Sequence, residues 1–85
     1  MKMIYGNEPM LPRVKAVEVC PDYKLLLTFN NGEKKIFDAK PLFAVAMYQE
    51  LDAVFSAAHV EFGTVVWPGD MDVSPDMLYM QSVQA

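Results

Sequence analysis

Residues 23–38, YKLLLTFNNGEKKIFD, decide the fold of this chain. Two runs of β-forming residues flank Asn31 and Gly32, and an Asn-Gly pair in that position is the strongest short-range signal of a β-hairpin. With a two-residue loop, the residues that pair across the hairpin are Asn30 with Glu33, Phe29 with Lys34, Thr28 with Lys35, Leu27 with Ile36, and Leu26 with Phe37. We therefore expect this hairpin to lie at the centre of a small antiparallel sheet.

The expected register gives the hairpin one apolar face and one mixed face, because successive side chains of a strand point to opposite sides. The side chains on the apolar face, which we expect to lie in the core, are Leu25, Leu27, Phe29 and Ile36. The side chains on the mixed face are Leu26, Thr28, Lys35 and Phe37. We expect the mixed face to be partly covered, and the N-terminal arm, a helix and a partner are the alternatives for its cover.

The residues before the hairpin divide into an arm and a strand. Residues 1–12 are interrupted by glycine and proline and are expected to form an N-terminal arm. Residues 13–19, RVKAVEV, alternate as a strand does, and the slip between Ala16 and Val17 predicts a β-bulge. A chain of 85 residues has room for one domain, which we place over residues 13–85.

Helical and strand patterns follow the hairpin. Asp38 can cap a short helix over residues 39–46. The residues at positions i, i+3, i+4 and i+7 of a second helical stripe are Leu51, Val54, Phe55 and Ala58. Residues 59–62, HVEF, and 64–67, TVVW, predict two further strands. The predicted fold class is α+β, with an antiparallel sheet of about five strands, hairpin 23–38 central, packed against two or three short helices.

The segment 65–79, VVWPGDMDVSPDMLY, has both a structural and a functional interpretation. Ser74 is a fitting N-cap, followed by Pro75 at the first helical position and Asp76 near the positive end of a helix that reaches Ser82. The same segment places the only tryptophan and three acidic residues in the half of the chain that has no basic residue. The candidates for the exposed face of a partner-binding site are therefore Trp67, Asp70, Asp72, Asp76 and Tyr79.

No pattern predicts a catalytic or metal site. Oxygen-bearing residues alternate over residues 70–76 as they do at the start of a calcium loop. Such a loop requires Gly at its sixth position and Glu at its twelfth, where this chain has Pro75 and Gln81. His59 and Cys20, each the only residue of its type, match neither the spacing of a zinc site nor a known nucleophilic signature. We therefore expect no enzyme activity, no metal and no cofactor.

Composition predicts a soluble cytoplasmic protein with a partner. Hydrophobic residues make up 53% of the chain, more than one small core can cover, which favours an apolar surface that faces a small protein partner or a second copy in a homodimer. The single cysteine cannot form an internal disulfide, which fits a reducing compartment. The N-terminus lacks an apolar run of signal-peptide length, and no apolar run is long enough to span a bilayer.

Charge is divided unevenly along the chain. All seven basic residues lie in residues 1–40 together with five acidic ones, whereas residues 41–85 carry six acidic residues and no basic one. This distribution disfavours a broad nucleic-acid footprint. The Lys-rich hairpin, with Lys24, Lys34 and Lys35, leaves a nucleic-acid-binding regulator open as an alternative, and small-ligand binding is another.

Motifs in a fixed order give the chain a family resemblance. They are V-x-x-V-x-V (14–19), D-Y-x-L-x-L-x-F-x-N-G-E (22–33), F-D-x-x-P-L (37–42), L-x-x-x-F (51–55) and W-P-x-x-x-D-x-x-P-D-x-L-Y (67–79). In this order they resemble the bacterial domain of unknown function 2442 family over nearly the whole domain. The turn after Trp67 and Pro68 departs from the Asn-Gly of that family, because this chain has Gly69 and Asp70 there.

The resemblance implies a small α+β domain without an assigned activity, and it assigns no catalytic residue. Some relatives resemble one half of a toxin–antitoxin-like pair. The function predicted from the sequence is therefore a protein-binding, regulatory module, antitoxin-like, that acts through an apolar surface edged with acid. Its expected partner is a small protein; nucleic acid and membranes are not expected partners.

Overall fold

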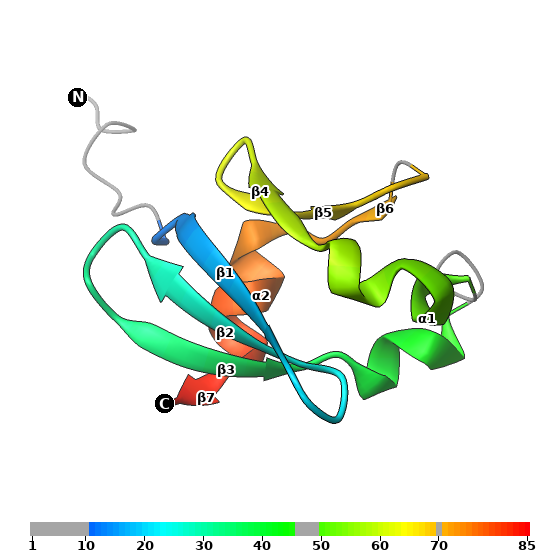
Figure 1. The fold of residues 1–85 in the computed structure, drawn as a ribbon. Helices are drawn as coiled ribbons and strands as arrows, with labels where there is room; N and C mark the ends of the chain where they lie inside the picture. The colour runs from blue at the N-terminus through cyan, green and yellow to red at the C-terminus, as the bar shows by residue number, and fades with distance from the viewer. Residues whose placement is uncertain (1–10, 46–49, 70) are drawn as a thin grey trace.

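Two antiparallel sheets organise the computed structural model, which describes residues 11–45, 50–69 and 71–85 (Figure 1). The strands of the first sheet, in the order β1-β2-β3-β7, are β1 (Val14–Cys20), β2 (Lys24–Phe29), β3 (Lys34–Asp38) and β7 (Val83–Gln84). Those of the second sheet, in the order β4-β5-β6, are β4 (His59–Glu61), β5 (Thr64–Trp67) and β6 (Met71–Asp72). The helical elements are the 3₁₀ segments η2 (Lys40–Ala44) and η4 (Phe55–Ala57) and the helices α1 (Leu51–Val54) and α2 (Pro75–Gln81). The α+β class is confirmed, whereas the prediction of a single sheet differs in detail because the strands divide between two sheets.

The β2–β3 hairpin forms at the predicted place, but its register differs from the prediction by one residue. The observed pairs include Leu25 with Phe37, Leu26 with Ile36, and Thr28 with Lys34. The amide of Phe29 donates to the carbonyl of Glu33 at 2.8 Å, so the loop consists of three residues, Asn30, Asn31 and Gly32. Gly32 has a φ of 91°, the left-handed conformation that ends this type of loop.

The register decides which side chain of β3 reaches the core. Phe37 is buried on the same face as Leu25, whereas Ile36 is half-buried on the opposite face beside Leu26. The prediction that placed Ile36 in the core and Phe37 on the mixed face is therefore wrong. A shift of one residue in the register moves every side chain of a strand to the other face.

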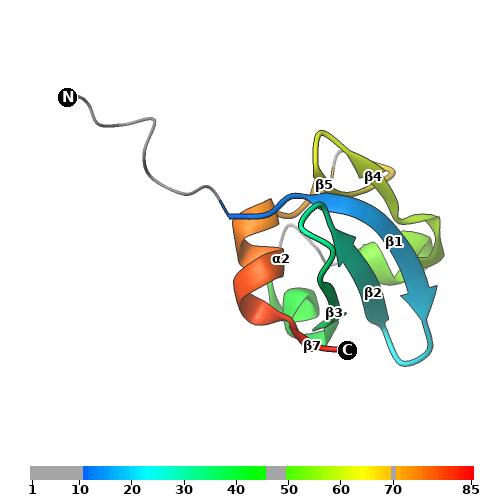
Figure 2. The same ribbon diagram turned by 90° about the vertical axis from the view of Figure 1, so that its left-hand side faces the viewer.

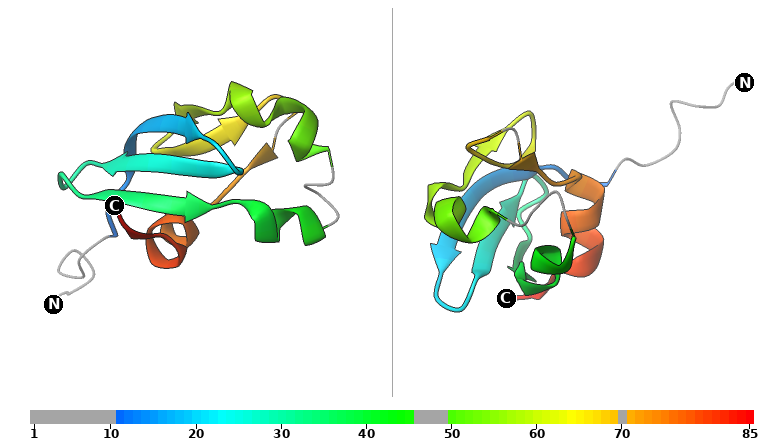
Figure 3. Two further views of the ribbon diagram at one scale, coloured as in Figure 1. Left: turned by 60° about the horizontal axis from the view of Figure 1, so that its bottom comes forward. Right: turned by 90° about the vertical axis from the view of Figure 1, so that its right-hand side faces the viewer.

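Helix α2 covers one face of the first sheet, and the second sheet lies beside β1 (Figures 1 and 2). The amide of Val14 donates to the carbonyl of Gly63 at 2.8 Å and so connects β1 to the β4–β5 turn. The helical segments η2, α1 and η4 lie together beyond one end of the first sheet (Figure 3). One continuous core joins these layers, and its buried side chains are Val14, Leu25, Leu27, Phe29, Phe37, Ala39, Leu42, Leu51, Phe55, Val65, Trp67, Val73 and Leu78.

The predicted start of α2 is confirmed. The hydroxyl of Ser74 accepts a hydrogen bond from the amide of Asp76 at 3.2 Å, as an N-cap residue does. Val73 and Leu78, which stand on either side of the cap, are both buried and fix the direction in which the chain enters the helix. The helix ends at Gln81, one residue before the predicted end.

The other predicted elements are present with different bounds. The carboxylate of Asp38 accepts from the amide of Lys40 at 3.0 Å, and η2 follows in place of the helix predicted over residues 39–46. The irregularity in β1 lies between Val14 and Ala16 rather than between Ala16 and Val17. The first ten residues of the predicted arm lie outside the described residues. In the described part of the chain, no helix has the length and apolarity needed to cross a membrane.

Candidate functional site

The residues predicted to form a partner site do not share one exposed surface. Trp67 ends β5, and its side chain is 0% exposed. Its indole Nε1 donates to the backbone carbonyl of Phe55 at 3.0 Å. The indole also stacks on the Phe55 ring, with the ring centroids 5.9 Å apart. The prediction that Trp67 lies on the exposed face is therefore wrong. An indole whose N–H finds a buried acceptor contributes its large apolar surface to the core.

Tyr79 is half-buried and links α2 to the β2–β3 hairpin. Its hydroxyl donates to the carboxylate of Glu33 at 2.5 Å, and its ring meets the ring of Phe29 edge-on with centroids 5.1 Å apart. The ammonium group of Lys35 lies 4.0 Å from the Tyr79 ring centroid. The hydrogen bond from Tyr79 is the largest of the causes that hold the pKa of Glu33 below its ordinary value. These contacts give Tyr79 a structural role on the covered side of the sheet.

The predicted acidic residues occupy separate places. Asp72 lies in β6 and Asp76 in the first turn of α2, and both are exposed. Asp70 lies outside the described residues. The structure therefore leaves Asp72 and Asp76 as the predicted residues that are exposed, whereas Trp67 is buried.

An apolar groove between η2 and α2 was not predicted from the sequence. Its volume is about 390 Å³, at the lower end of the range for ligand pockets. Phe37 and Leu42 are buried beneath it, and Val45, which is 46% exposed, lies at its edge. The residues that line this α2–η2 groove are Phe37, Asp38, Pro41, Leu42, Val45, Met77 and Gln81. The groove therefore presents mainly apolar side chains that solvent can reach.

The charged group that lines the groove is a carboxylate. The amide of Lys40 donates to Asp38, and this hydrogen bond is the main cause that lowers the pKa of the Asp38 carboxyl group. The Lys40 ammonium group lies 2.8 Å from Asp22 and 3.6 Å from Asp38. Asp38 is therefore ionised at neutral pH, while Lys40 divides its charge between two acidic partners.

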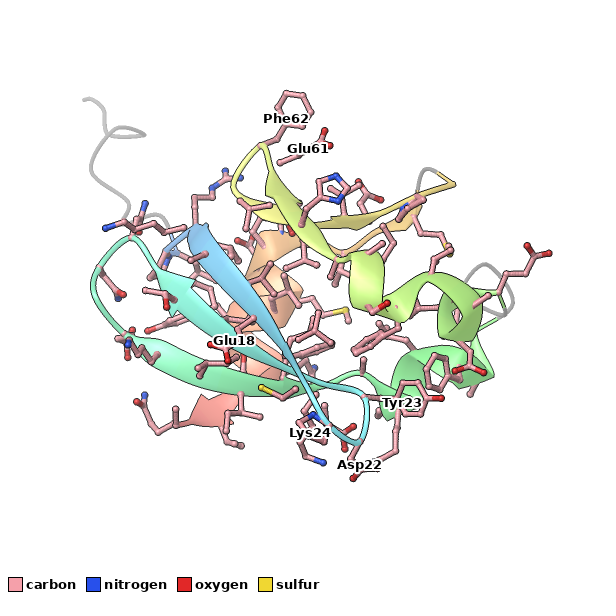
Figure 4. The ribbon with its side chains drawn as sticks, in the orientation of Figure 1. Glu18, Asp22, Tyr23, Lys24, Glu61 and Phe62 are labelled. Carbon is pink, nitrogen blue, oxygen red and sulfur yellow. The ribbon has the colours of Figure 1, made fainter. Side chains whose placement is uncertain are left out.

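The Lys-rich hairpin does not present its three lysines as one patch. Lys24 lies 3.2 Å from Asp22 at one end of β2 (Figure 4). Lys35 reaches across the covered face of the sheet and donates to the carbonyl of Tyr79 at 2.9 Å. Lys34 begins β3 at the other end of the hairpin. Two of the three charges are therefore engaged within the fold.

His59, the only histidine of the chain, lies within hydrogen-bonding distance of two oxygen atoms. His59 Nε2 lies 2.6 Å from the Glu61 carboxylate, and His59 Nδ1 lies 3.1 Å from the carbonyl of Ala57. The Ala57 carbonyl and the Glu61 carboxylate, in that order, raise the pKa of His59. Within residues 11–45, 50–69 and 71–85, no three His, Cys, Asp or Glu side chains come together as metal ligands.

The fold and the groove define a small α+β domain with two antiparallel sheets and an apolar groove beside its C-terminal helix. The family described as Protein of unknown function (DUF2442) matches residues 14–84. The chain belongs to this family, as its motifs predicted. No curated protein and no solved structure matches the chain.

Proposed function

We propose that this chain is a protein-binding, regulatory module rather than an enzyme, and that its partner inserts an apolar side chain into the α2–η2 groove. The observation that carries this proposal is the groove itself, which presents Pro41, Val45 and Met77 around a buried floor. A groove beside a helix can receive a bulky side chain of a partner and exclude water around it, which is how a small number of residues supply most of the affinity of an interface.

Charge indicates the kind of partner. Asp38 lines the groove as an ionised carboxylate, and Asp76 stands one residue before Met77 on the same helix. Residues 41–85, which supply most of the lining, contain no basic residue. A partner segment that carries an apolar side chain next to Lys or Arg complements such a surface. We propose a small protein with such a segment, in an arrangement similar to that of an antitoxin and its toxin.

The test compares two methionines of α2. Met77 lines the groove, whereas Met80 is 72% exposed and is not among the residues that line it. A Met77→Asp variant places a charge against the apolar floor and is expected to weaken partner binding at least about tenfold. Met80→Asp is the matched control on the same helix and is expected to bind as the parent does.

Partners are captured with the tagged parent and with both variants, with and without nuclease, and are identified by mass spectrometry. The affinity of the purified partner is then measured by calorimetry, with circular dichroism as a check on folding. A protein that binds the parent and Met80→Asp but not a folded Met77→Asp supports the groove. Equal binding by all three contradicts it. Loss of all captured material after nuclease treatment favours the nucleic-acid alternative instead.

A second variant tests the charge. Asp38→Asn removes the negative charge at the groove with almost no change in side-chain size, and its amide oxygen can still accept from the amide of Lys40. A partner with a basic segment is expected to bind this variant more weakly and with less dependence on salt concentration than it binds the parent. An unchanged affinity and salt dependence would show that the partner segment is not basic.

A further inference from the structure

We propose that the face of the first sheet that the described residues leave uncovered is the interface through which two copies of this chain form a homodimer. This outer face is the one that points away from α2, and its central part is formed by Ala16, Glu18, Leu26, Thr28, Lys34, Ile36 and Val83, with Cys20, Lys24 and Asp38 at one end. It is turned toward the viewer in Figure 1, with α2 behind the sheet. The inference concerns a different surface from the α2–η2 groove and does not depend on the proposed function.

An apolar row crosses the outer face. The strand register places Leu26 beside Ile36 and Ile36 beside Val83, so three neighbouring strands contribute to one row. Val83 is 65% exposed, and Leu26 and Ile36 are half-buried without belonging to the core cluster. Two sheets that pack face to face bury rows of this kind between them.

Opposite charges stand on the two sides of this row. Glu18 on β1 is in register with Leu26, and Lys34 lies on β3 one side-chain level further along. Among the described residues, neither Glu18 nor Lys34 has an ion-pair partner. Because β2 lies between β1 and β3, Glu18 and Lys34 of one copy are separated by a strand and do not pair with each other.

A hollow lies on the same face between these charges. Its volume is about 160 Å³, and its lining residues are Ala16, Val17, Glu18, Leu26, Thr28 and Lys34. A hollow bordered by an apolar row can receive a side chain from a facing sheet, because facing sheets interdigitate. The hollow therefore gives the outer face a place for a side chain of a second sheet, next to its separated charges.

Charge complementarity identifies the second copy as the occupant. A twofold axis parallel to the strands, between β2 and β3, lays β2 of one copy over β3 of the other and β1 over β7. Glu18 of each copy then lies over the Val83 side of its partner, one strand away from Lys34 on β3. Because a twofold interface repeats each contact, two pairs of opposite charges border the paired apolar rows. The same arrangement brings Val83 of each copy over the β1 side of its partner.

The experiment is sedimentation velocity of the full chain over a concentration series, and the parent is expected to form a dimer. Glu18→Lys and Lys34→Glu each place like charges one strand apart across the interface and are expected to raise the dimer dissociation constant roughly tenfold. The double variant exchanges the two charges and is expected to restore the dimer. Glu61→Lys is the matched control, because Glu61 lies on the second sheet (Figure 4).

A further variant tests the apolar row. Val83 stands at the surface in the two-residue strand β7, so Val83→Asp leaves the core unchanged. This variant is expected to be folded by circular dichroism and to lose the dimer. A parent that is monomeric at every concentration overturns the proposal. So does a dimer that withstands Val83→Asp and both single charge reversals, since its interface would then lie on another surface.

Discussion

Phe62 combines a strained backbone with an exposed side chain. It has a φ of 54° beside Gly63, whose φ is 77°, in the turn between β4 and β5. Both central residues of this turn are therefore left-handed, a conformation that favours Asn-Gly and is costly for an aromatic residue. The ring is 92% exposed and extends from the tip of the hairpin (Figure 4), so burial within the fold does not offset the strain.

Replacing Phe62 with a residue that tolerates the left-handed conformation should stabilise the domain. Phe62→Asn is expected to raise the free energy of unfolding by about 1 kcal/mol, because it restores the Asn-Gly turn. The measurement is urea denaturation followed by circular dichroism. Phe62→Ala removes the ring but keeps the backbone penalty, so its stability should stay close to that of the parent. An equal gain from both variants would place the cost in the ring and contradict this explanation.

The Tyr79–Glu33 hydrogen bond makes the folded state sensitive to acid. Because the pKa of Glu33 is lowered in the folded chain, its contribution to stability is complete above its unfolded pKa and is lost as the pH falls through its folded pKa. Tyr79→Phe is expected to raise the pKa of Glu33 toward its ordinary value, which a carboxyl NMR titration measures. Gln84→Ala removes a weaker bond to the same carboxylate and should raise the pKa less. The reverse order would contradict the assignment.

At the scale of elements, the sequence predicts the β2–β3 hairpin but leaves its register open. The alternation of Leu25, Leu27 and Phe29 assigns the core face of β2. On β3 the apolar residues Ile36 and Phe37 are neighbours, so the pattern suits either one as the core residue. An Asn-Gly pair fits both a two-residue loop and the end of a three-residue loop. Tertiary packing against α2 therefore decides between registers that the local pattern allows.

The candidate site also combines features that neighbouring residues determine with features that depend on contacts between distant segments. The N-cap Ser74 and the apolar residues on either side of it, Val73 and Leu78, lie within one short stretch of sequence, so the start of α2 was predictable. The burial of Trp67 was not predicted, because the run TVVW indicates a strand and its acceptor, the carbonyl of Phe55, comes from a separate segment. The α2–η2 groove forms only where two short elements meet, and no local pattern pairs Leu42 with Met77.

The β2–β3 and β4–β5 turns should differ in their tolerance of a methyl group. Gly32 and Gly63 both have positive φ, so an alanine at either position should cost about 1–2 kcal/mol through the backbone. A Cβ atom at Gly32 has no neighbour within 4 Å, whereas one at Gly63 would lie 3.1 Å from Cβ of Arg13. Gly63→Ala should therefore be the more destabilising change in urea denaturation. Equal losses would indicate that the Arg13 side chain, just before β1, adjusts freely.

At the scale of the whole molecule, one core joins the two sheets. Val14 of the first sheet and Val65 and Trp67 of the second belong to the same buried cluster. The hydrogen bond from Val14 to Gly63 connects the sheets at the start of β1. Neither sheet buries its apolar side chains without the other, so we expect one cooperative unfolding transition.

This prediction can be checked with two probes. The fluorescence of Trp67, the only tryptophan, reports the packing of β5 against η4, and far-ultraviolet circular dichroism reports backbone structure throughout the chain. The two denaturation curves are expected to coincide within error. A tryptophan transition at lower urea concentration than the dichroism transition would mean that the second sheet unfolds first as a separate unit.

The three-residue loop of the hairpin also indicates where this sequence can change length during evolution. Deletion of Asn30 or Asn31 would leave two loop residues between Phe29 and Glu33, so the same residues can still pair across the hairpin and Phe37 still faces the core. Deletion of one residue between Glu33 and Phe37, by contrast, would turn Phe37 to the opposite face of the sheet. Homologues are therefore expected to differ in length within the loop and to keep the spacing between Glu33 and Phe37.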